Sequence, residues 1–124
     1  MEKGALGKPL GPYSHFSRSG PFVFVSGQIP VDKDGRILNE AGIEEQTLLT
    51  MQNLKEVLEC AGSSLAKVLK VNIYLTDYSN DFQRMNSVYK AFFDQTNYPA
   101  RCCVGVSQLA GGVRIEVDAI ALAD

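Results

Sequence analysis

Several features that usually guide the interpretation of a sequence are scarce in this one. Its 124 residues include three cysteines and a single histidine, His15, which lies far in the sequence from any cysteine. That number and spacing predict neither a disulfide framework nor a metal site. No apolar run approaches the roughly 18 residues of a membrane span. The first residues lack the apolar core of a signal peptide, so we expect a cytoplasmic protein in a reducing compartment.

An excess of charge of one sign is also missing. Twelve Lys and Arg against fourteen Asp and Glu leave a formal net charge of −2, whereas a nucleic-acid binder needs a concentrated basic field. The chain has no P-loop and no GxSxG, HExxH or GxGxxG motif. Hydrophobic residues make up 45% of the chain and charged residues 21%, and no linker or repeat divides it. We therefore expect one globular domain over residues 1–124.

Two segments have the apolar spacing of amphipathic helices. In the first, over residues 43–61, the stripe contains Ile43, Thr47, Met51, Leu54, Leu58 and Ala61, widened by Leu48 and Val57. Gly62 follows where helices commonly end in a left-handed residue. The second begins at the cluster Ser79-Asn80-Asp81, and the spacing of Asn80 and Gln83 indicates a capping box. Its predicted stripe contains Phe82, Met85, Tyr89 and Phe92, with Val88 and Phe93 beside it.

Four segments are typical of strands. Residues 22–25 form a compact apolar run that ends at Gly27 and predicts a buried strand. Residues 68–76 alternate, which places Leu69, Val71, Ile73 and Leu75 on one side. Residues 102–107 and 113–122 follow, and the turn at Gly111-Gly112 predicts that they form a closing hairpin. Because each helix has one apolar stripe, both should pack on one face of a single sheet, in a two-layer α+β fold.

The other face of the predicted sheet is not a simple solvated surface. On the last strand Val113, Ile115, Val117, Ala119 and Ala121 form an apolar side, and the opposite side carries Arg114, Glu116, Asp118, Ile120 and Leu122. The preceding long strand mixes Val68 and Tyr74 with Lys70 and Asn72 on that side. So many bulky apolar groups favour a subunit interface. A solvent-facing surface with scattered apolar residues is the alternative.

Two charged residues stand out as candidates for chemistry. Arg101 follows a proline at the start of an apolar strand, where its planar fork could bind a carboxylate, although for this residue alone a surface arginine at a strand end is the favoured interpretation. Glu116 lies in mid-strand and could hold a water as a general base, or form a cross-strand ion pair, or be exposed. Cys103 has no evident histidine partner, so a small buried residue is the simpler interpretation.

Several motifs together resemble the reactive intermediate deaminase family, also called the RidA, YjgF or liver perchloric-acid-soluble protein family. They are GPYSH at residues 11–15, FVSGQIP at 24–30, NxxYxxFF at 86–93, PARCCV at 99–104 and IEVDAIA at 115–121. They occur in the family's order over nearly the whole chain. The resemblance implies a chorismate-mutase-like α+β fold, two helices on one face of a mixed sheet, and a homotrimer with clefts between its subunits.

The implied activity is that of a 2-iminobutanoate/2-iminopropanoate deaminase. Such an enzyme hydrolyses imines and enamines, such as 2-aminoacrylate from pyridoxal-phosphate-dependent dehydratases, to 2-oxo acids and ammonia, and needs no cofactor of its own. Arg101 matches the family arginine that clamps the substrate carboxylate, and Glu116 matches the acid that orients the attacking water. The resemblance also implies substrate-binding roles for Tyr13, Ser26, Gly27, Asn86 and Cys103.

The chain departs from the family pattern at a few positions, and other functions remain open. Cys102 stands where serine is common and His15 where glutamine is common, and residues 105–111 are less charged than usual. A carboxylate-binding regulatory trimer would also keep Arg101. An endoribonuclease or translation inhibitor is a weaker alternative, because the chain has one histidine and no basic stripe.

Overall fold

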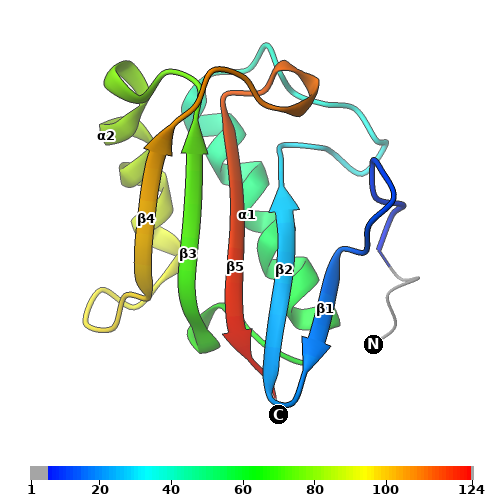
Figure 1. Ribbon diagram of the computed structural model, residues 1–124. Coiled ribbons are helices and arrows are strands. Elements are labelled where there is room, and N and C mark those ends of the chain that lie inside the picture. Colours follow the sequence, from blue (N-terminus) through cyan, green and yellow to red (C-terminus); the bar gives the residue numbers. More distant parts are fainter. Residues whose placement is uncertain (1–5, 124) are drawn as a thin grey trace.

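The computed structural model describes residues 6–123, which contain a five-stranded sheet with two helices on one face (Figure 1). The strands are β1 (Phe16–Ser19), β2 (Phe22–Gln28), β3 (Val68–Leu75), β4 (Ala100–Gly105) and β5 (Ile115–Leu122), and the helices are α1 (Ile43–Cys60) and α2 (Tyr78–Tyr89). Short 3-10 turns occur at Leu65–Lys67, Lys90–Phe92 and Ala110–Gly112. The predicted α+β class and the position of both helices are confirmed. No helix within residues 6–123 is both long and apolar enough to cross a membrane.

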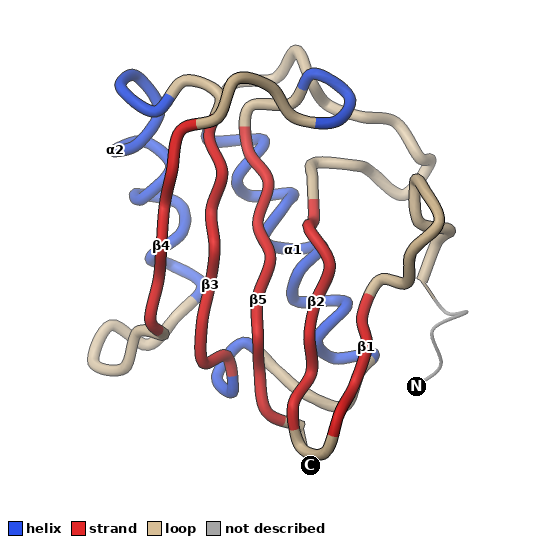
Figure 2. The backbone as a smooth tube through the Cα atoms, in the orientation of Figure 1, coloured by secondary structure: helices blue, strands red, loops and turns tan. Residues whose placement is uncertain are grey.

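The predicted closing hairpin is wrong. The strand order is β1-β2-β5-β3-β4, so β3 lies between β4 and β5. β4 pairs with β3 in parallel because α2 forms a crossover between them, whereas β5 pairs antiparallel with both β2 and β3. Gly111 and Gly112 have positive φ values of 69° and 70° and do turn the chain. However, the loop that contains them passes over the end of β3 and brings β5 to the middle of the sheet (Figure 2).

The buried faces of β2 and β3 differ from the prediction in detail. Val71, Ile73 and Leu75 are fully buried as expected, but Leu69 is exposed and Val68 takes the inward position. The cause is an irregularity in the pairing with β5 between Val68 and Lys70, which shifts the alternation by one residue. In β2, Val23 and Val25 point inward, whereas Phe22 and Phe24 are each 42% exposed on the uncovered face of the sheet.

The helix boundaries follow from local chemistry. α1 ends at Cys60, and Gly62 adopts the predicted left-handed conformation with φ 81°. Leu48, expected on its apolar stripe, is exposed. α2 begins one residue before the predicted start. The predicted capping box is wrong, because the N-cap is Asp77, which makes no side-chain cap hydrogen bond, and Asn80 lies inside the helix, where its amide donates to the Asp77 carboxylate (2.9 Å).

One buried charge links α2 to the start of β5. Asp81 is completely buried and accepts two hydrogen bonds from the Arg114 guanidinium, at 2.6 and 2.9 Å. The backbone N–H of Arg114 donates to Gln46, another fully buried side chain, at 2.8 Å. Arg114 therefore turns toward α2, and it does not lie on the uncovered face where the sequence placed it.

We expect Arg114→Ala to lower the free energy of unfolding by about 3 kcal/mol, because it leaves the Asp81 carboxylate buried without its cation. Chemical denaturation would measure the change. Arg36→Ala is a matched control, since Arg36 pairs with Asp32 and Asp34 at a highly exposed site and its loss should change stability little. Equal effects of the two substitutions would contradict a structural role for the Asp81 pair.

Candidate functional site

Arg101 lies in a cradle formed by α2. It is the second residue of β4 and pairs with Val71 of β3, so it shares the helix-covered face of the sheet. Its Nη1 donates to the Asn86 side-chain oxygen at 2.7 Å. Its guanidinium carbon lies 4.9 Å from the ring centre of Tyr89 and 5.8 Å from that of Phe82. Three residues of one helix thus surround the guanidinium group.

The sequence explains this cradle through helical periodicity. Phe82, Asn86 and Tyr89 are separated by four and three positions, which places them on one face of α2. The parallel pairing of β3 with β4 brings Arg101 against that face. A guanidinium group presents five N–H donors in a planar fork. The hydrogen bond to Asn86 uses one of them, so the arrangement can orient others toward a carboxylate.

Cys103 lies on the same face of β4, two residues beyond Arg101, and pairs with Ile73. Burial raises the pKa of the Cys103 thiol, while the nearby charge of Arg101 acts in the opposite direction. The thiol therefore stays protonated near neutral pH, which does not suit a nucleophile.

Glu116 forms the centre of a second group of residues. It lies in β5 opposite Tyr74 of β3, on the uncovered face of the sheet, and its side chain rests on the backbone of Gly27. A Cβ atom at Gly27 would come within 2.8 Å of the Glu116 carboxyl carbon, so only glycine leaves room for this side chain in its present position. Burial, and then the charge of Asp118, raise the pKa of Glu116. The carboxyl group is therefore more basic than an exposed one.

Asp118 is held beside Glu116 by two donors that the sequence analysis did not assign. The Asn72 amide donates to Asp118 at 2.9 Å and the Tyr74 hydroxyl at 3.1 Å. The alternation of β5 could have indicated this neighbour, since residues two apart in a strand share a face. The position of the Asp118 carboxylate, and so its effect on the pKa of Glu116, depends on the pairing of β5 with β3, which the sequence does not specify.

The segment before β1 is fastened next to Gly27. The Ser26 hydroxyl donates to the Ser14 carbonyl (2.6 Å), and the Ser26 N–H donates to the His15 carbonyl (2.9 Å). Tyr13, nearly half exposed, lies directly before these residues. Tyr13 and Ser26 therefore lie in the same region of the structure as Gly27, on which the Glu116 side chain rests.

The two groups do not meet within one chain. Arg101, Asn86 and Cys103 lie on the helix-covered side of the sheet. Glu116 lies on the other face, which Figure 1 shows uncovered. The mid-strand alternation of β5 and the position of β3 between β4 and β5 separate them. A site that used both Arg101 and Glu116 would need two copies of the chain.

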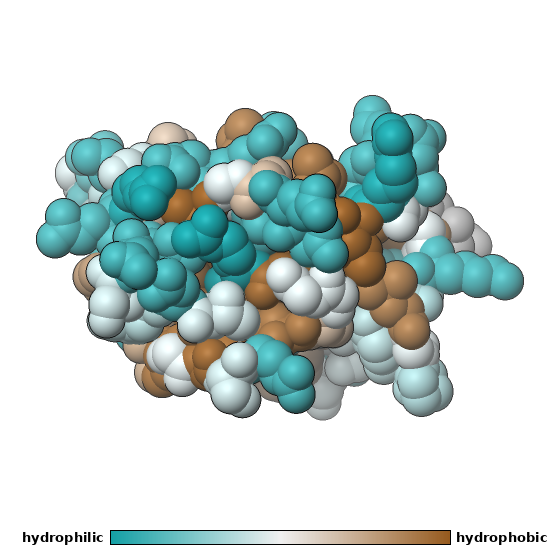
Figure 3. Space-filling view, turned by 90° about the horizontal axis from the view of Figure 1, so that it is seen from above, coloured by the Kyte–Doolittle hydropathy of each residue, from teal (hydrophilic) through white to brown (hydrophobic). Residues whose placement is uncertain are grey.

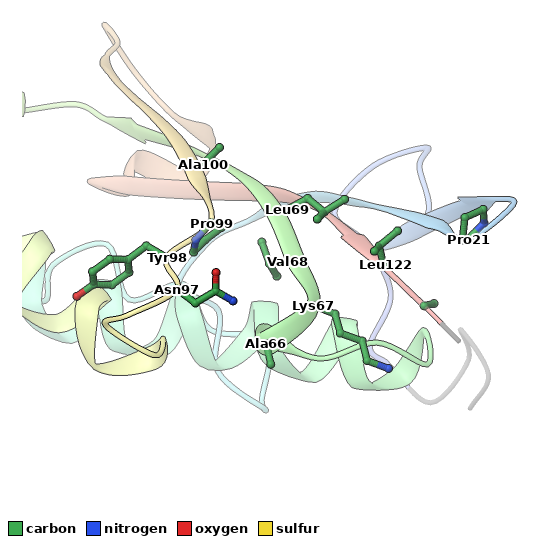
Figure 4. A pocket seen from close by; sticks show the side chains of 11 residues that line it. Pro21, Ala66, Lys67, Val68, Leu69, Asn97, Tyr98, Pro99, Ala100 and Leu122 are labelled. Carbon is green, nitrogen blue, oxygen red and sulfur yellow. The ribbon is translucent and has the colours of Figure 1, made fainter.

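Two hollows on the surface of the described residues contain neither Arg101 nor Glu116. One, of about 510 Å³, lies where β3 and β4 begin and is lined by side chains that include Lys67, Leu69, Tyr98 and Leu122 (Figure 4). Another, of about 420 Å³, lies between the segment before β1 and α1, and Tyr13, His15 and Gly27 line it. The end of the molecule that carries the 106–114 loop is mainly hydrophilic, with apolar residues between the polar ones (Figure 3).

The part of the chain that the structure describes holds no group of three His, Cys, Asp or Glu side chains suited to a metal ion.

Tyr89 and Phe82 were predicted only as members of a helical apolar stripe, yet they contact Arg101. Their spacing relative to Asn86 was visible in the sequence. The pairing that brings Arg101 to them was not.

Comparison with known proteins shows similarity over almost the whole chain. Residues 4–123 match a family model described as Endoribonuclease L-PSP. A RutC family protein of Pyrococcus abyssi is 47% identical over 114 residues, which are 92% of this chain and 88% of that protein. An Escherichia coli K12 protein with the provisional name reactive intermediate deaminase TdcF is 41% identical over 116 residues, 91% of this chain and 88% of its own. The crystal structure of E. coli TdcF with bound serine has a TM-score of 0.86 and 40% identity, and covers 94% of this chain and 91% of that one.

Proposed function

Since the chain belongs to the RidA/YjgF family, we propose that it hydrolyses 2-imino acids, or their enamine tautomers, to 2-oxo acids and ammonia. The observation that carries the proposal is the Arg101 guanidinium, which is hydrogen-bonded to Asn86 beside the Tyr89 ring and has further donors left for a ligand. Such a fork is suited to a carboxylate, the group that all 2-imino acids share. The name of the E. coli relative supports a deaminase reaction of this kind.

The reaction needs little more than an anchor and an oriented water. Water adds to the electrophilic carbon of the protonated C=N bond while Glu116 accepts a proton from the water, and a neutral carbinolamine forms. Glu116 returns this proton to nitrogen, the C–N bond breaks and ammonia leaves, while the hydroxyl oxygen forms the C=O bond and its proton passes to Glu116. A raised pKa makes Glu116 a stronger base than an ordinary carboxylate, which suits this role. Binding both reactants in one geometry supplies much of the rate enhancement.

We place the active site between subunits. Arg101, Asn86 and Cys103 of one subunit would bind the carboxylate, and Glu116, Gly27, Ser26 and Tyr13 of a neighbour would hold the water and enclose the substrate. The positions of Arg101 and Glu116 on opposite faces support this division. The uncovered sheet face, with its exposed Phe22, Phe24 and Leu122, is a suitable contact surface. A cyclic trimer is the assembly that the family resemblance favours.

A coupled assay tests the activity. A serine or threonine dehydratase generates the imine in place, and semicarbazide traps what remains of it. We expect the wild-type protein to suppress the semicarbazone signal, and Arg101→Ala and Glu116→Gln to lose that ability. If the folded wild-type protein changes nothing with small or large imino acids, it is not an imine deaminase.

The raised pKa of Glu116 gives a pH prediction. As pH falls, the carboxylate that accepts the proton is lost at a pH above the ordinary carboxyl pKa of 4.5, so kcat/KM should decrease there. Asp118→Asn keeps the hydrogen-bonding shape beside Asn72 and Tyr74 but removes the neighbouring negative charge. It should move this acid limb to lower pH. A ¹³C NMR titration of Glu116 measures the pKa directly, and an unchanged value in Asp118→Asn would contradict the assignment.

The wild-type protein and the same variants also distinguish the deaminase from two other functions. A regulatory trimer would bind 2-oxo acids through Arg101 without releasing ammonia. Endoribonuclease activity, named in the family description, has less physical support, because the net charge is −2 and the one histidine, His15, is hydrogen-bonded to the Gly7 carbonyl at 2.5 Å. RNA cleavage by a nuclease-free preparation, lost in Arg101→Ala, would favour it instead.

A further inference from the structure

Tyr89 is a tyrosine in a place where phenylalanine would pack equally well. It is only 4% exposed and its ring packs against Phe93 with centroids 4.9 Å apart. Its hydroxyl group is buried and has no hydrogen-bond partner of ordinary geometry among residues 6–123. A buried hydroxyl without a partner is unfavourable, and a phenylalanine would avoid that cost. The hydroxyl therefore calls for a partner, although none of the described residues meets it with ordinary hydrogen-bond geometry.

The nearest charge is that of Arg101. Its guanidinium carbon lies 4.9 Å from the Tyr89 ring centre, within the range of a cation–π interaction. Burial raises the pKa of Tyr89 to about 12, and the positive charge of Arg101 acts against that rise. The phenol is consequently neutral under ordinary conditions, and its oxygen can accept a hydrogen bond from a guanidinium N–H.

Asn86 and Tyr89 approach Arg101 from the same helix. The Asn86 oxygen already accepts a hydrogen bond from Nη1, and Tyr89 lies one turn further along α2 with its ring under the group. A flexible arginine that must meet a carboxylate with two parallel N–H groups benefits from support on its other edge and on its face. Asn86 supplies the edge contact, and Tyr89 is placed to supply the face and a second acceptor.

We infer that Tyr89 is a positioning residue for Arg101: its ring supports the guanidinium group, and its hydroxyl oxygen accepts a guanidinium N–H when a carboxylate occupies the outer edge. This inference rests on the proposed function, because it assigns the carboxylate to Arg101. Tyr89 does not itself touch the substrate. It acts on the orientation of the arginine and therefore on the affinity for carboxylates.

The test compares KM and kcat for the imino acid with affinity for 2-oxobutanoate, the product-like probe, measured by calorimetry. We expect Tyr89→Leu to raise KM and the 2-oxobutanoate dissociation constant about tenfold, and Tyr89→Phe about threefold, with kcat changed less than about twofold. The uncharged analogue 2-oxobutanamide should bind all variants alike. In the Arg101→Ala background, Tyr89→Leu should have no further effect, since it acts through the arginine.

Met85→Ala is the control for damage to α2. Met85 is fully buried on the same helix, so its truncation should lower the melting temperature but leave KM unchanged. Tyr89→Phe keeps the ring volume and so remains informative if Tyr89→Leu does not assemble. Wild-type affinity in Tyr89→Phe, or an equal effect of Tyr89→Leu with and without Arg101, would overturn the inference. Carboxylate binding that depends on Tyr89 without any turnover would overturn the proposed function alone.

Discussion

Oligomers formed from equal amounts of Arg101→Ala and Glu116→Gln chains should regain about a quarter of wild-type activity, although each variant alone is nearly inactive. Loss of Arg101 removes two charge-assisted hydrogen bonds worth about 1.5–3 kcal/mol each, so each site should lose about a hundredfold or more in kcat/KM. Loss of the Glu116 carboxylate removes the proton acceptor, with an effect of about a hundredfold or more. Recovery on mixing is therefore measured against a very low background.

The expected recovery follows from the opposite faces of the sheet. If each site takes Arg101 from one subunit and Glu116 from the next, a mixed assembly contains some interfaces with both residues intact. With random mixing, the subunit that supplies Arg101 has it intact with a probability of about one half, and so does the neighbour that supplies Glu116. About one site in four therefore has both residues intact. If both residues acted within one chain, every site would carry one defect and mixing would restore nothing.

The measurement is ammonia release after the two variants are unfolded together, refolded and checked for mixed assemblies by native mass spectrometry. Arg101→Ala mixed with the double variant Arg101→Ala/Glu116→Gln is the control, because no chain then supplies the arginine. Mixed assemblies that stay inactive would contradict a site shared between subunits.

The sequence predicted the individual helices and strands better than it predicted which strands pair with one another. The stripe of α1 and the left-handed Gly62 depend on residues close together in the chain, and both are confirmed except for the exposed Leu48. Strand order depends on contacts between distant residues, and the turn at Gly111-Gly112 is compatible with either a hairpin or the crossing that the structure contains. The exposed Leu69 has the same origin, because the irregularity that shifts it arises from pairing with β5.

The same distinction applies to the candidate site. Arg101 and Glu116 could be singled out from residue type and motif, but alternation within a strand does not say how two strands are related. The register Val71↔Arg101 and Tyr74↔Glu116 puts them on opposite sides, because residues 71 and 74 are an odd number of positions apart in β3. The support of Arg101 by Tyr89 depends on the same register.

Gly27→Ala should reduce kcat/KM about a hundredfold while the protein stays folded, because a displacement of a catalytic group by about 1 Å can cost that much. The substituted Cβ would lie 2.8 Å from the carboxyl carbon and 3.1 Å from Cγ of Glu116, so the side chain must move. Gly27 does not have a positive φ, and alanine there meets no other obstacle of that severity.

Stability should respond differently from activity. Alanine restricts the unfolded chain more than glycine does, which offsets the displacement of a flexible side chain, so the free energy of unfolding should change by no more than about 1 kcal/mol. Gly42→Ala is the matched control, since its Cβ would lie at an ordinary 3.7 Å from Glu44 and far in sequence from Glu116. It should leave kcat/KM unchanged.

A Glu116 variant tests whether Gly27→Ala acts through the Glu116 carboxylate. In the Glu116→Gln background, Gly27→Ala should cause little further loss, because the proton acceptor is already missing. If the two losses instead multiply, Gly27 contributes to catalysis by another route, such as a backbone contact with the substrate. Full activity in Gly27→Ala would mean that the position of Glu116 against β2 is not needed, and it would remove the geometric basis for Glu116 as the base.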